Sequence, residues 1–232
     1  MRSLVVFLCF IIPFNGICKI DTTANKFYKP LIVSGSLITS GLLLQNSKYS
    51  LQNKYGDLTD TKIDDYIQYA PMAIMYGANL TGIRPKNSLL NQTKFLVMSQ
   101  CLNAGIVLSL KYFTGIESPD KSNFHSFPSG HTSMSFVGAT TLFNEFQGSS
   151  YLLASSGFLF STATGVLRVT NNKHWVPDVL VGAGIGILAT SIIYKLEPLK
   201  NWNPFKRKSQ TNMSFSPSID FYNKQFSLTL SL

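Results

Sequence analysis

The chain has 232 residues, a formal net charge of +9 and 45% hydrophobic residues, which suffices for one packed domain or a bundle of about six helices. Its basic residues are scattered and are not interleaved with base-stacking aromatics. This pattern argues against nucleic-acid binding and favours anionic headgroups or phosphate-bearing ligands, with a lysine-rich solvated surface as the alternative. The three cysteines, Cys9, Cys18 and Cys101, exclude a disulfide framework and a thiolate metal site.

The N-terminal segment, MRSLVVFLCFIIPFNGICKI, has the layout of an export signal. One arginine precedes an apolar run, and Gly16 and Cys18 are small residues where cleavage would occur. The apolar run is short for a membrane span, so an uncleaved anchor is the alternative. We expect residues 1–18 to be a cleaved signal peptide.

Apolar patterning predicts a series of helices after this leader, at about 29–46, 65–83, 94–114, 129–146, 151–168 and 177–195. The last two have the highest apolar density. Glycine, alanine, serine and threonine are frequent, which suits close helix packing in a membrane bundle or in a tight soluble core. Most segments are borderline in length for crossing about 30 Å of hydrocarbon. The sequence therefore predicts an all-α, six-helix bundle that is either membrane-embedded or membrane-docked.

Two further segments differ in character from the helices. NSKYSLQNKYGDLTDTKIDD, between the first two predicted helices, is a polar connector with room for a short amphipathic piece. NWNPFKRKSQ is a basic hinge, and the alternating apolar residues at the C-terminus predict one strand of a β-hairpin that turns near 222–224. We expect a helical domain over residues 19–200, followed by the hinge and hairpin over 201–232.

Residues with chemical potential stand at the ends of three predicted helices. Lys111 ends the third helix, and Pro-Ser-Gly-His (128–131) begins the fourth. Arg168 ends the fifth helix, His174 lies in the following turn, and Asp178 falls in the first turn of the sixth. If the helices alternate in direction, these ends all lie on one side of the bundle.

The chemistry of these residues suits an anion. A helix that starts with Ser129 and Gly130 offers free backbone N–H groups and the positive end of its dipole, and glycine allows a phosphate oxygen to approach closely. His174 and Asp178 are four residues apart, so the carboxylate can accept from one imidazole nitrogen and direct the other at a substrate. The two cations, from the third and fifth helices, would add positive charge for the phosphate oxygens.

Each feature also has a plainer explanation. The Pro-Ser-Gly-His segment can be a helix cap, and His174 with Asp178 can be a structural pair. Lys111 can be a lysine whose amine reaches the polar boundary at a helix end. Their joint occurrence at matching helix ends favours one pocket over three unrelated features.

The motifs resemble those of the type 2 phosphatidic acid phosphatase (PAP2) superfamily, which also includes bacterial acid phosphatases and vanadium haloperoxidases. The family pattern is Lys, six residues, Arg-Pro; then Pro-Ser-Gly-His; then Ser-Arg, five residues, His, three residues, Asp. Residues 128–131 match in full, and Arg168, His174 and Asp178 match the spacing of the third motif. The resemblance covers about residues 65–195, and SFPSGHT with NNKHWVPDVLVGAGIGIL is similar to members from Bacteroidetes-type bacteria.

Two positions depart from the family pattern. Ser118 stands where the family has the arginine of the first motif, and Leu167 replaces the serine of the third. Losing a bidentate cation from a phosphate pocket would cost about a few kcal/mol of transition-state stabilisation. Lys121 and His125, in the same loop, are candidates to compensate in part.

The resemblance implies roles for the residues that match. His174 would attack phosphorus and form a phosphohistidine, Asp178 would orient His174, and His131 would protonate the leaving oxygen. The phosphoryl oxygens would be held by Lys111, Arg168, Ser129 and the backbone N–H of Gly130. The resemblance implies no metal and no cofactor, and the sequence offers no evident metal cage.

These expectations describe a metal-independent phosphatase acting on a phosphomonoester or pyrophosphate of a membrane lipid: lipid A, an isoprenyl diphosphate, phosphatidate or phosphatidylglycerophosphate. One alternative is a catalytically weakened protein that binds lipid phosphates, because Ser118 replaces the family arginine. The other is a haloperoxidase-like enzyme that holds vanadate in the same pocket. The expected partners are the lipid substrate and the membrane.

The expected location is the bacterial cell envelope. If the leader is removed and all six helices span, the third helix ends on the cytoplasmic side. A site that faces the periplasm, which we favour, requires that one early helix does not cross or that an exported domain docks on a membrane.

Overall fold

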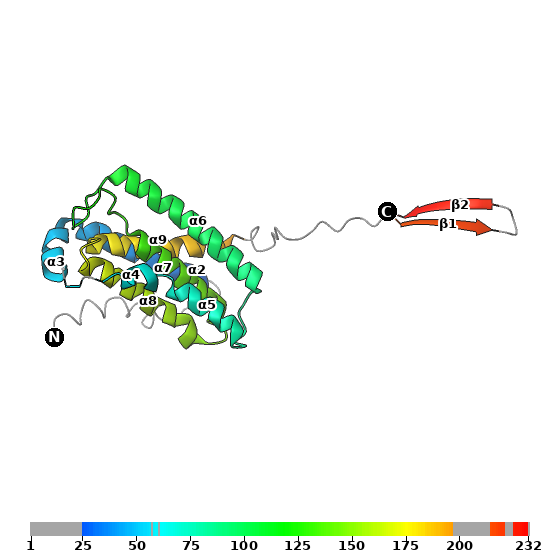
Figure 1. Ribbon diagram of the computed structural model, residues 1–232, viewed down its shortest axis with the longest axis horizontal. Coiled ribbons are helices and arrows are strands. Elements are labelled where there is room, and N and C mark those ends of the chain that lie inside the picture. Colours follow the sequence, from blue (N-terminus) through cyan, green and yellow to red (C-terminus); the bar gives the residue numbers. More distant parts are fainter. Residues whose placement is uncertain (1–24, 57, 60, 197–213, 221–224, 232) are drawn as a thin grey trace. The chain divides into compact units, whose positions relative to one another are not determined.

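The computed structural model describes residues 25–56, 58–59, 61–196, 214–220 and 225–231 (Figure 1). The expected signal peptide lies outside the described residues. The chain divides into two compact units, Met1–Leu196 and Glu197–Leu232.

The first unit is helical. Its elements are α2 (Asn25–Leu43), the 3-10 helix η2 (Leu44–Ser47), α3 (Lys48–Tyr55), α4 (Ile63–Ile67), α5 (Ala70–Leu80), α6 (Leu89–Thr114), α7 (Gly130–Phe146), α8 (Tyr151–Thr170) and α9 (Val176–Lys195). The prediction of an all-α bundle is confirmed for this unit.

One predicted helix, 65–83, is wrong as a single element, because the chain forms α4 and α5 there. Pro71 lies in the first turn of α5. Proline lacks a backbone N–H and its ring disfavours a continuous helix through the preceding turn, so it suits a helix start and not a helix interior. The break leaves α4 as a separate turn that carries Asp64 and Asp65.

Helix α9 forms the centre of the bundle. It packs against α2, α6 and α7, and 83% of its most apolar 18-residue window is buried. Glycines on α9 permit this packing, because a Cβ on Gly182 would lie 2.6 Å from the backbone oxygen of Ser129, and one on Gly186 would lie 2.4 Å from that of Ser133. Close contact between α7 and α9 places the start of α7 beside the start of α9.

Three of the described helices, α6, α8 and α9, are long and apolar enough to cross a membrane. Helices α6 and α8 present more large apolar side chains on the surface of the bundle than α9, which has Ile192: these are Leu90, Val97 and Leu108 on α6, and Leu152 and Leu159 on α8. This distribution is typical of helices that contact lipid.

The second unit contains two strands, β1 (Ser214–Asp220) and β2 (Gln225–Ser231). They pair antiparallel, with Phe215 opposite Leu230 and Ile219 opposite Phe226. The segment in which the sequence predicts the turn, 222–224, lies outside the described residues.

Candidate active site

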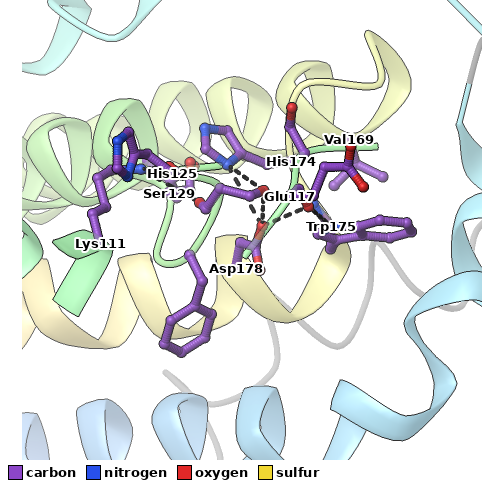
Figure 2. Close-up of polar contacts among 12 residues, drawn as sticks. Lys111, Glu117, His125, Ser129, Val169, His174, Trp175 and Asp178 are labelled. Atoms are coloured by element: carbon purple, nitrogen blue, oxygen red, sulfur yellow. Dashed lines mark hydrogen bonds and ion pairs between the residues drawn. The ribbon is translucent and has the colours of Figure 1, made fainter. Parts of the chain in front are cut away.

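The ends of four helices are joined by hydrogen bonds at one end of the bundle. The Nζ of Lys111, on the last turn of α6, donates to the backbone oxygens of His125 and Ser126 in the loop before α7. The backbone N–H of Ser129, which caps α7, donates to the backbone oxygen of Asp178 in α9 at 3.0 Å. The backbone N–H of His174 donates to the oxygen of Arg168 at the end of α8 at 3.1 Å. Figure 2 shows four of the residues that the sequence analysis singled out, Lys111, Ser129, His174 and Asp178, at this end of the bundle.

His174 and Asp178 form the buried centre of this site. Nδ1 of His174 lies 3.6 Å from Oδ2 of Asp178, which is an ion-pair distance rather than a direct hydrogen bond. Ser126 lies between them, because its hydroxyl donates to Oδ2 of Asp178 at 2.5 Å and lies 3.4 Å from Nδ1 of His174. The same Oδ2 accepts from the backbone N–H of Trp175 at 3.1 Å. These contacts fix the carboxylate behind Nδ1 and leave Nε2 as the nitrogen that faces away from Asp178.

The environment of His174 favours its neutral form. Burial lowers the pKa of His174 below its usual 6.5, Asp178 opposes this shift, and the charges of Arg168 and Lys111 add to it. A neutral imidazole retains a lone pair on one ring nitrogen, so it can act as a nucleophile near neutral pH.

The start of α7 supplies backbone donors. Its first N–H groups have no acceptor within the helix and lie at the positive end of the helix dipole. The N–H of Ser129 is already used by Asp178, and its buried hydroxyl lies 2.9 Å from that of Thr132. A Cβ on Gly130 would lie 3.8 Å from Cε of Lys111, so the lysine reaches the helix start. Three residues here were predicted to bind phosphoryl oxygens. Gly130 and Lys111 are better placed to do so than Ser129, whose N–H and hydroxyl already have partners.

Arg168 is held by a carboxylate that the sequence analysis did not single out. Its Nη1 lies 2.7 Å from Oδ2 of Asp64, a side chain that is only 3% exposed, and 3.5 Å from Oδ1 of Asp65. Its Nε is buried and has no hydrogen-bond acceptor among the described residues. Arg168 therefore keeps a buried donor that an oxyanion could use.

Asp65 also contacts the other histidine. Its Oδ1 lies 3.1 Å from Nε2 of His131, in the first turn of α7. Burial lowers the pKa of His131 and Arg168 adds to this effect, whereas Asp65 and Asp64 oppose it. Arg168 thus lowers the pKa of both histidines, and Oδ1 of Asp65 lies 3.5 Å from Nη1 of Arg168 and 3.1 Å from Nε2 of His131.

The predicted polar connector fixes the position of these two aspartates. Gln52, in α3, donates to the backbone oxygen of Val169 at 3.1 Å. Asn171, after α8, donates to the oxygen of Thr61 at 2.8 Å and to Oδ1 of Asp64 at 3.0 Å. The connector is therefore attached to the end of α8 instead of being a free loop.

Ser118 is a loop residue in this arrangement. It is buried, and its hydroxyl donates to Oδ1 of Asp120 at 2.7 Å; the other oxygen of Asp120 pairs with Lys173 at 2.7 Å. Lys121 and His125 are exposed. Lys121 and Ser118 line a cavity of about 230 Å³ that also includes Lys48 and Trp175. The lining of this cavity includes Trp175, which follows His174 in the chain, and neither His131 nor His174.

Three residues of the site were missed from the sequence: Asp64, Asp65 and Ser126. The two aspartates end a polar connector, and such segments are usually solvated. A signal was present, because an Asp-Asp pair is unusual in a chain with only 11 acidic residues. Among the described residues, no group of three His, Cys, Asp or Glu side chains is arranged to hold a metal ion.

Comparison with known proteins gives consistent matches. The sequence pattern of the PAP2 superfamily matches residues 77–202. A lipid A 1-phosphatase of Porphyromonas gingivalis is 34% identical over 142 residues, which are 60% of this chain and 32% of that protein. A probable lipid phosphate phosphatase 4 of Arabidopsis thaliana is 35% identical over 91 residues, which are 34% of this chain and 30% of that protein.

The chain thus spans about a third of the length of these curated relatives. In three dimensions it is similar to the crystal structure of Aquifex aeolicus LpxE, with a TM-score of 0.50 and 23% identity, over 64% of this chain and 94% of that one. This likeness concerns the fold.

Proposed function

We propose that this chain, which belongs to the PAP2 superfamily, is a phosphatase that removes a phosphate group from a membrane lipid through His174. The observation that carries the proposal is the buried His174–Asp178 pair, which lies beside Arg168 and the start of α7. A neutral histidine with one nitrogen fixed by a carboxylate, next to cations and free N–H groups, is the arrangement that phosphoryl transfer to histidine needs.

In the first step, Nε2 of His174 attacks phosphorus in line with the lipid oxygen. The N–P bond forms as the P–O bond to the lipid breaks, and the lipid oxygen takes a proton from His131. Asp178 stabilises the positive charge that develops on the His174 ring. Because Asp178 also accepts from Ser126 and Trp175, it keeps its position while this charge appears.

In the second step, water attacks the phosphohistidine. His131, now neutral, accepts a proton from the water, the N–P bond breaks, and inorganic phosphate leaves with His174 restored. In both steps, negative charge spreads over the phosphoryl oxygens. In this proposal the guanidinium of Arg168, whose Nε has no acceptor among the described residues, stabilises that charge together with the Nζ of Lys111 and the N–H of Gly130.

The surroundings of the site favour a lipid substrate. Tyr112 and Phe113, next to Lys111, are 81% and 82% exposed, and Phe124, next to His125, is 62% exposed. Aromatic side chains are enriched where a protein meets the membrane–water boundary. An aromatic rim beside the catalytic residues would bring the site to the level of lipid headgroups.

Lipid A is the first substrate to test, since the Porphyromonas gingivalis relative is a lipid A 1-phosphatase. We also propose that residues 1–18 direct export, that residues 19–200 form the catalytic domain, and that the site faces the periplasm. No role is assigned to the tail, residues 201–232.

The test is phosphate release from lipid A, phosphatidate, phosphatidylglycerophosphate and undecaprenyl diphosphate in mixed micelles. Wild type is compared with His174→Ala, Ser118→Arg and the control Lys195→Ala, which lies at the far end of α9 from His174. The proposal is supported if wild type and Lys195→Ala release phosphate from one or more of the lipids and His174→Ala does not. No release by wild type together with release by Ser118→Arg would instead mean that the pocket is intact but disabled by Ser118, which favours the alternative of a protein that binds lipid phosphates.

A further inference from the structure

We infer that Asp65 is a positioning residue for His131: its carboxylate accepts from Nε2, favours the protonated imidazole and directs Nδ1 at the leaving oxygen. The inference rests on the proposed function and extends it to a carboxylate outside the three family motifs. The contact that carries it is the 3.1 Å pair between Oδ1 of Asp65 and Nε2 of His131.

His131 can act as the general acid only when its imidazole is protonated, and Asp65 favours that form. A general acid must carry its proton when the substrate arrives. His131, however, is partly buried and lies near Arg168, and both conditions disfavour the imidazolium. A neutral His131 whose single N–H is bound to Asp65 has no proton on Nδ1 to give to the leaving oxygen of a lipid phosphate.

Helix α4 supplies the opposing charges. Its two aspartates have different partners: Asp64 pairs with the guanidinium of Arg168, and Asp65 faces both Arg168 and His131. The charged groups that act on His131 are thus Arg168 from α8 and the two aspartates from α4. Asp64 reduces the repulsion from Arg168, and Asp65 favours the protonated imidazole directly.

The geometry also assigns the two ring nitrogens. With Nε2 donating to Asp65, the proton on Nδ1 is the one available for transfer. When the P–O bond breaks, the lipid oxygen takes this proton, and His131 remains neutral with its Nε2–H still bound to Asp65. Asp65 therefore acts through His131 and does not contact the substrate.

The contact between Asp65 and His131 is not an incidental surface pair, because α4 is held in place by its own contacts. Asp64 is buried, and it is fixed by Arg168 and by Asn171. The loop before α4 is bonded to the end of α8 through Thr59, whose hydroxyl donates to Asn171 at 2.6 Å. Asp65 therefore has a fixed place relative to α8, although its own side chain is 49% exposed.

The first measurement is independent of activity: the pKa of His131, from an NMR titration of the imidazole protons in micelles. The three histidines of the chain are assigned with His→Gln variants. In Asp65→Asn the pKa of His131 should fall by about half a unit to one unit, as expected for the loss of a half-exposed partner. Asp65→Glu should restore most of the His131 value, and Glu117→Gln, which removes an exposed carboxylate elsewhere, should leave it unchanged.

The second measurement separates proton donation from a general loss of structure. A lipid phosphate has a poor leaving group and needs the acid, whereas p-nitrophenyl phosphate has a good one and needs it little. Asp65→Asn should lower kcat on the lipid about tenfold and on the aryl phosphate about twofold or less. Glu117→Gln should change neither, and Asp65→Glu should recover the lipid rate.

An unchanged His131 pKa in Asp65→Asn overturns the inference, as does an equal loss of kcat on both substrates. If Asp65→Asn fails to fold, Asp65→Ser, which also removes the charge, decides by the same criterion: a fall in the His131 pKa supports the inference, and an unchanged pKa overturns it. If wild type hydrolyses neither substrate, the proposed function fails, and the titration still decides whether Asp65 controls His131.

Discussion

Replacing Gly182 with alanine tests whether the contact between α9 and the cap of α7 sets the geometry of the site. The new Cβ would lie 2.6 Å from the backbone oxygen of Ser129, whereas an ordinary contact begins at 3.4 Å. The two helices must therefore separate by roughly 0.8 Å, the difference between these values. That movement stretches the hydrogen bond from Ser129 to Asp178 and shifts the first N–H groups of α7 away from His174.

The expected effect on stability is moderate. Overpacking of this kind costs about 1–3 kcal/mol, and the better helix propensity of alanine returns about 1 kcal/mol. The expected effect on activity is larger, because a displacement of about 1 Å at a catalytic site can lower the rate about a hundredfold. We expect Gly182→Ala to lose roughly tenfold to a hundredfold in kcat with a net loss of stability of at most about 2 kcal/mol.

Gly105→Ala is the matched control, because Gly105 is also helical but no atom lies within 4 Å of its added Cβ. This variant should keep full activity and gain up to about 1 kcal/mol of stability. Both variants are compared by unfolding in detergent and by phosphate release from the lipid that wild type hydrolyses. Equal stability and equal rates for the two variants would refute the reasoning.

Further predictions concern the loop, the pH dependence and the membrane. Ser118→Ala removes the hydrogen bond to Asp120. It should therefore lower the free energy of unfolding by about 1 kcal/mol and change kcat by less than about threefold. A larger loss of kcat would mean that Ser118 contacts the substrate. Burial lowers the pKa of His131 below 6.5, so its protonated form becomes scarce as the pH rises. The kcat on a lipid phosphate should therefore fall about tenfold between pH 7 and 8. A pH profile of kcat that is level over this range would exclude His131 as the acid. Replacing both Tyr112 and Phe113 by serine should lower phosphate release from lipid in vesicles at least about fivefold and leave release from p-nitrophenyl phosphate unchanged. The reason is that the exposed rings contact the membrane and not the reacting atoms. Equal losses on both substrates would contradict this role.

Those parts of the site that depend on local spacing could be predicted from the sequence. His174 and Asp178 are four residues apart on either side of the helix cap Trp175, whose N–H donates to Asp178, so short spacing across a helix start brings them close. Pro177 and Asp178 in the first turn mark where α9 begins. The start of α7 after Pro128 was predicted within one residue for the same kind of reason.

Parts of the site that depend on contacts distant in sequence could not be predicted. Asp64 pairs with Arg168 across 104 positions, and Ser126 donates to Asp178 across 52. No periodicity within one segment encodes such pairs, since they depend on how the connector folds onto α8. The break between α4 and α5 was missed because the apolar periodicity continues across it, although Pro71 marks the point where α5 begins.

The central claim is that phosphate passes through His174, and the most direct measurement is capture of the phosphorylated enzyme. Wild type is mixed for milliseconds with a lipid substrate carrying radioactive phosphate and quenched in detergent at alkaline pH, where phosphohistidine survives. The account predicts label on the peptide that contains His174, no label in His174→Ala, and stronger labelling in His131→Ala with a substrate that has a good leaving group, because the water step then slows. Phosphate release that persists in His174→Ala, or label on another residue, would contradict the account.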